Sequence, residues 1–122
     1  MKPKALLLAS LVAICVCGHA DEVPLPIADG HYTFLVRFAE HLTMTGGQLD
    51  VAIRGRHIVI TSKPKASVFP TGLVVEGILL WHAPSKQWII GETEADAAIE
   101  DVGGCTGGPV VVDLERKEFW TC

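Results

Sequence analysis

Residues 49–61 read LDVAIRGRHIVIT, and every second position on either side of Gly55-Arg56 is apolar. Such alternation is typical of a β-strand with one buried face. If Gly55-Arg56 is a two-residue loop, Ile53 lies opposite Ile58. Val51 then lies opposite Ile60, and all four side chains point to the same face. Glycine at the first loop position fits a type II′ turn, so the stretch predicts a β-hairpin.

The same alternation predicts further strands on both sides of this hairpin. These strands are residues 32–38, 73–82, 87–91, 110–114 and 118–122. The first of them begins directly after the turn signal Asp29-Gly30. A four-residue loop between strands 73–82 and 87–91 sets Trp81 opposite Trp88. Gly77, within strand 73–82, predicts a bulge or bend. Residues 21–30 carry two prolines without periodicity and are interpreted as an extended lead-in.

One short helix is expected near residues 93–101. Thr93 can cap it, Asp96 follows three residues later as in a capping box, and Gly103-Gly104 ends it. The sequence therefore predicts a mainly β domain over residues 21–122, with about seven strands in an antiparallel meander. Such a meander forms a small barrel or a two-layer sandwich. The barrel is favoured because closure leaves no exposed sheet edge.

The first twenty residues have the three parts of a secretory signal peptide. Lys2 and Lys4 form the basic start, residues 5–17 are almost wholly apolar, and small residues precede a cleavage site after Ala20. The apolar run is too short to span a bilayer. We therefore expect cleavage, a periplasmic or secreted protein, and no transmembrane segment after processing.

Cleavage also removes two of the four cysteines and leaves Cys105 and Cys122. An even pair in an oxidising compartment predicts a disulfide. A loop of this size is worth about 3 kcal/mol of stability. The bond would also tie the C-terminal residue to the rest of the domain.

The net charge is −4, with 14 acidic and 10 basic side chains. Loss of Lys2 and Lys4 lowers it to −6, because no acid leaves with them. This balance argues against nucleic acid as a partner. The acids concentrate in one segment, where they are Glu92, Glu94, Asp96, Glu100 and Asp101.

This acidic segment is a candidate binding site. Asp96 and Glu100 would be like charges at i, i+4 of the expected helix, and Glu100 and Asp101 would lie at the wrong end of its dipole. A sequence that accepts both penalties suggests that the charge is presented to a basic protein or to Ca²⁺, although the spacing is not that of an EF-hand. A solvated acidic loop that aids solubility is the alternative.

Trp81 and Trp88 are the second candidate, as an expected cross-strand aromatic pair. They would form either the floor of a small-ligand site, a hot spot for a protein, or part of the core. The four histidines of the mature chain are His31, His41, His57 and His82. Their spacing does not suggest a metal site, so we expect no metal or cofactor and scattered surface histidines. His57 and His82 share the polar phase of their strands and could converge.

Residues 105–111 read CTGGPVV. Over these seven residues the chain resembles the nucleophile segment of chymotrypsin-like serine proteases, where a serine precedes Gly-Gly-Pro. Thr106 takes the place of that serine, and Gly104-Cys105 replaces the Gly-Asp before it. No histidine has the Ala-Ala-His-Cys setting of that family, and two barrels do not fit in this chain. We interpret the segment as a glycine-rich turn beside the disulfide and expect no enzyme.

A binding module is the expected function. Its plan resembles that of small periplasmic inhibitors of lysozyme in signal peptide, antiparallel β domain and acidic balance against a basic target. The resemblance is one of architecture and implies no residue roles. A cell-envelope protein would be held through residues 92–101, steered by charge. The alternative is a lipocalin-like carrier with a small apolar ligand inside the barrel, lined by Tyr32, Phe34, Trp81 and Trp88.

Overall fold

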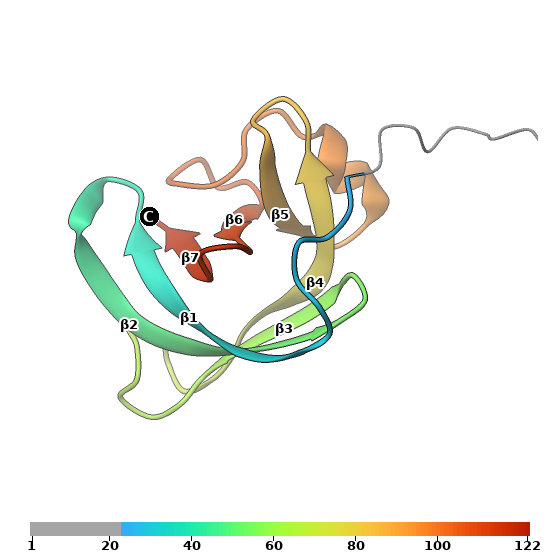
Figure 1. The fold of residues 1–122 in the computed structure, drawn as a ribbon. Helices are drawn as coiled ribbons and strands as arrows, with labels where there is room; N and C mark the ends of the chain where they lie inside the picture. Colours follow the sequence, from blue (N-terminus) through green and yellow to red (C-terminus); the bar gives the residue numbers. More distant parts are fainter. Residues whose placement is uncertain (1–22) are drawn as a thin grey trace, which may run out of the picture.

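The computed structural model describes residues 23–122, so the expected signal peptide over residues 1–20 lies outside the described residues. Within that range the chain forms a closed barrel of seven strands (Figure 1). In chain order these are β1 (Gly30–Phe38), β2 (His41–Arg54), β3 (His57–Ser62), β4 (Gly72–His82), β5 (Gln87–Gly91), β6 (Val110–Asp113) and β7 (Glu118–Thr121). A 3-10 helix, η1 (Glu94–Ala98), lies between β5 and β6. The expected mainly β fold is confirmed. Of the two architectures that the sequence left open, a small barrel and a two-layer sandwich, the chain forms the barrel.

Consecutive strands are antiparallel neighbours, and the barrel closes where β1 and β7 pair in parallel. Val36 of β1 lies opposite Phe119 of β7 at this parallel seam, and both side chains are buried. A hairpin cannot join two parallel strands, so the seam depends on segments from opposite ends of the described chain.

The hairpin registers expected from the alternation are confirmed. Ile53 pairs with Ile58 and Val51 pairs with Ile60 across β2 and β3. Gly55 has φ of +60°, as a type II′ turn requires at its first central position. Trp81 and Trp88 pair across β4 and β5, with ring centroids 5.3 Å apart in an edge-to-face arrangement.

Thirteen buried apolar side chains from all seven strands and the loop after β6 pack into one core. They are Phe34, Val36, Leu49, Val51, Ile53, Ile58, Ile60, Leu79, Trp88, Ile90, Val112, Leu114 and Phe119. The lead-in adds Val23, Leu25 and Ile27, which are half-buried against this core. These three alternate with Pro24, Pro26 and Ala28, so the lead-in has a period of two after all. It forms no strand, because proline has no N–H to donate to a sheet.

Three local expectations need correction. β2 begins at His41, well before Leu49, and its first half is exposed apart from the two glycines at 46 and 47. The irregularity of β4 lies between Leu73 and Val75, whereas Gly77 stays in register with Ile58. Glycine is needed at 77 because a Cβ there would collide with the carbonyl oxygen of Gly91. The helix is a single 3-10 turn that ends at Ala98.

Candidate binding surfaces

The β5–β6 loop, residues 92–109, covers part of the outer barrel wall. Beneath it lies a second, smaller core made of Leu80, Ile89 and Val111, which point outward from their strands. Ala97 and Val102 of the loop pack onto them. In Figure 1 this orange segment lies at the top, while the β1–β2–β3 sheet runs along the bottom. The loop is therefore a packed layer of the fold.

His82 fixes the middle of the loop to β4. Its side chain is 1% exposed, although the other described histidines are exposed, so it is not a surface histidine. Nε2 lies 2.7 Å from the carbonyl oxygen of Ile99, and Nδ1 lies 2.6 Å from the hydroxyl of Ser85. A carbonyl can only accept, so Nε2 donates to Ile99, and in a neutral imidazole Nδ1 then accepts from the Ser85 hydroxyl.

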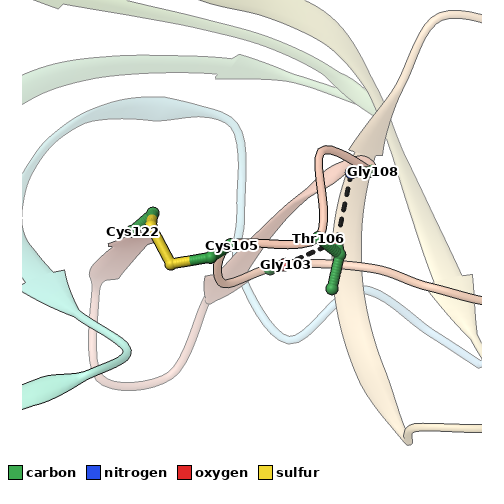
Figure 2. The surroundings of a disulfide bond; sticks show 5 residues. All are labelled: Gly103, Cys105, Thr106, Gly108 and Cys122. Carbon is green, nitrogen blue, oxygen red and sulfur yellow. Dashed lines mark hydrogen bonds between the residues drawn. A yellow bond between two sulfur atoms is a disulfide. The ribbon is translucent and has the colours of Figure 1, made fainter.

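A disulfide fixes the far part of the loop. Cys105 and Cys122 are bonded, as expected from the sequence (Figure 2). Next to the bond, the Thr106 hydroxyl donates to the Gly103 carbonyl at 2.8 Å and accepts from the Gly108 N–H at 3.1 Å (Figure 2). Thr106 therefore holds the turn together, and its hydroxyl is already engaged on both sides.

The five acids of the loop have different surroundings. Asp96 accepts hydrogen bonds from the backbone N–H groups of Glu92 and Thr93, at 2.7 and 3.3 Å, and so fixes the start of η1. Glu94 forms an ion pair with Arg56 at 3.0 Å. Glu92, Glu100 and Asp101 are exposed. Because η1 ends at Ala98, Glu100 and Asp101 lie outside it, and the expected i, i+4 repulsion and dipole penalties do not arise.

The tryptophan pair belongs to the barrel wall. Trp88 is 9% exposed and part of the main core, and Trp81 is half-buried against that core. Phe34, expected to line a ligand cavity in a carrier, is 0% exposed within the same cluster. These aromatic side chains pack against their neighbours inside the barrel.

The histidines do not converge. His57 Nε2 lies 2.9 Å from the Glu76 carboxylate on the barrel surface, whereas His82 contacts Ser85 and Ile99 under the loop. Among residues 23–122, no three His, Cys, Asp or Glu side chains are grouped so as to hold a metal ion.

The outer face of β1, β2 and β3 is hollowed, which sequence reasoning did not foresee. Two adjoining hollows, each about 480 Å³, share His31, Ala52 and Val59 in their linings. The signal was present in the sequence, because Ala52 and Val59 are small apolar residues in the outward phase of their strands.

No helix in the part of the chain that the structure describes is both long and apolar enough to span a membrane. Comparison of the chain with protein-family models, with curated proteins and with solved structures gave no match.

Proposed function

We propose that this chain is an exported binding module that holds a basic macromolecule of the cell envelope through its β5–β6 loop. The observation that carries the proposal is that this loop is both acidic and held rigidly against the barrel. Residues 92–109 contain five acidic side chains and no basic one. The His82 contacts and the disulfide hold the same segment in place.

Rigidity matters because ordering a loop on binding costs free energy. A loop of 18 residues that is already packed and cross-linked avoids much of that cost. Loops of more than about 12–15 residues are uncommon in compact domains and often functional. A field of one sign also accelerates encounter with a partner of the opposite sign.

Three acids carry this role, since two are engaged within the molecule. Glu92, Glu100 and Asp101 are exposed, whereas Asp96 fixes η1, and Glu94, although exposed, is paired with Arg56. Export is supported by the signal-peptide pattern of residues 1–20 and by the disulfide, which is typical of oxidising compartments. The carrier alternative gains no comparable support, because Phe34 and Trp88 are packed in the core.

The test is capture of envelope proteins by the immobilised mature domain at two salt concentrations. At about 0.01 M and about 1 M salt the screening length is about 30 Å and about 3 Å. We expect a basic protein to be retained at low salt and released at high salt. A basic lysozyme serves as a defined probe, because the plan expected from the sequence, a signal peptide and an acidic β domain, resembles that of periplasmic lysozyme inhibitors.

The matched variants separate the loop from overall charge. Glu92→Gln/Glu100→Gln should abolish capture, whereas Glu40→Gln/Glu115→Gln removes the same charge from exposed sites outside the loop and should retain it. Equal effects of the two double variants, or capture of no basic protein at low salt, would reject the proposal.

A further inference from the structure

The hollowed face is formed by β1, β2 and β3, and no residue of the β5–β6 loop is in its lining. Its two hollows share His31, Ala52 and Val59, so they form one continuous depression. Each has a volume of about 480 Å³, within the range of small-molecule sites, which is about 300–1,000 Å³. We call this depression the strand-face hollow.

Strand register gives the strand-face hollow an apolar row. His31 lies opposite Ala52 on the neighbouring strand, and Ala52 lies opposite Val59 on the next. Val51, Ile53, Ile58 and Ile60 point into the core. Ala52 and Val59 therefore point outward and provide a shallow apolar floor.

A polar row runs beside this floor. Thr33 lies opposite Asp50, and Asp50 lies opposite Thr61. Neighbouring strands are about 4.8 Å apart, and successive outward-facing residues of the same strand are about 7 Å apart. Two hydroxyls and a carboxylate thus border the apolar floor, and together they can both donate and accept hydrogen bonds.

Charged side chains of both signs border the strand-face hollow, and Asp29 and Arg54 are part of its lining. The Asp50 carboxylate lies 3.5 Å from the ammonium group of Lys63. The Glu76 carboxylate, next to Val59 on β4, lies 2.9 Å from the His57 imidazole. Neither sign of charge dominates, so this surface does not favour an ionic ligand.

We infer that the strand-face hollow binds a neutral saccharide. A pyranose ring has an apolar face of C–H groups, which fits the floor of Ala52 and Val59. Its hydroxyls both donate and accept, as do the threonine hydroxyls of the polar row, and the Asp50 carboxylate accepts. A purely apolar ligand that covered the polar row would leave the two threonine hydroxyls without partners, which costs free energy. This site is separate from the β5–β6 loop and does not depend on the function proposed for it.

The experiment follows backbone amide signals of the isotope-labelled mature domain by NMR during titration with maltotriose, cellotriose and triacetylchitotriose. At least one of these neutral trisaccharides should cause saturable shifts that concentrate at residues 31–33, 50–52 and 59–61. 1-Hexanol and trigalacturonate serve as the apolar and the anionic comparison. Both should bind more weakly than the best neutral sugar.

Ala52→Phe should fill the strand-face hollow and weaken binding by at least about tenfold. Gln48→Phe places the same side chain further along β2, at an exposed position outside the hollow, and should bind as wild type does. The amide spectrum of each variant shows whether it is folded. Saturation by none of the three neutral sugars, shifts centred elsewhere, or equal binding by both variants would overturn the inference.

Discussion

His82 is an example of a polar residue that alternation alone cannot place. Its strand position points outward, and an outward histidine is ordinarily in contact with solvent. The β5–β6 loop covers it, and both ring nitrogens are engaged, with Ser85 and Ile99. A buried imidazole is tolerated because its nitrogens have partners, and it fixes the loop to the barrel.

His82→Ala should lower the free energy of unfolding by about 1–3 kcal/mol, because a buried side chain and its hydrogen bond to the Ile99 carbonyl are lost. Urea denaturation measures this loss. Ser85→Ala removes only the exposed hydroxyl that bonds to His82 Nδ1 and should cost less than about 1 kcal/mol. Equal losses in the two variants would contradict a role for the bond to Ile99.

At the scale of elements, the strands that combine clear alternation with a short turn were predictable. The register of Ile53 with Ile58 and that of Trp81 with Trp88 follow from loop length alone. The first half of β2 was not predictable, because threonines and two glycines conceal its alternation. The lead-in itself was expected, but its packing against the core was missed, because the alternation of its prolines with apolar residues was not recognised.

The candidate site was only partly predictable, for a related reason. The sequence identified the acids of the β5–β6 loop, and Glu92, Glu100 and Asp101 are indeed exposed. The sequence could not show that Glu94 forms an ion pair with Arg56, because these two residues lie far apart in the chain. The strand-face hollow likewise depends on three strands lying side by side.

Gly77→Ala tests the close contact between β4 and β5. The added Cβ would meet the Gly91 carbonyl oxygen and lie 2.9 Å from a methyl carbon of Ile90. Overpacking of this kind costs about 1–3 kcal/mol, and the thermal midpoint should fall accordingly. Glu76→Ala, at the neighbouring exposed position, should stay within about 1 kcal/mol of wild type. A Gly77→Ala protein as stable as wild type would show that the strands separate without cost.

For the whole molecule, the decisive contacts join the two ends of the described chain. The disulfide connects Cys122 to the β5–β6 loop directly after β7, and β7 closes the barrel against β1. The bond and the parallel seam therefore support each other, because a fixed C-terminal residue keeps β7 in place.

Cys105→Ser/Cys122→Ser should lower the free energy of unfolding by about 3 kcal/mol. Hydrogen exchange should increase first at the parallel seam, at the amides of Leu35 and Phe119. Wild type treated with reductant should match the double variant. A loss spread evenly over all strands, without early exchange at the seam, would contradict this coupling.

The parallel seam also has a consequence for how the barrel assembles. Contacts between residues distant in sequence form late and slow the folding of β proteins. Until β7 docks, β1 presents unpaired backbone groups along one side, which is a template for association with other chains. Truncation before residue 118 would therefore leave an open six-stranded sheet whose exposed edges favour aggregation, instead of a slightly weakened barrel.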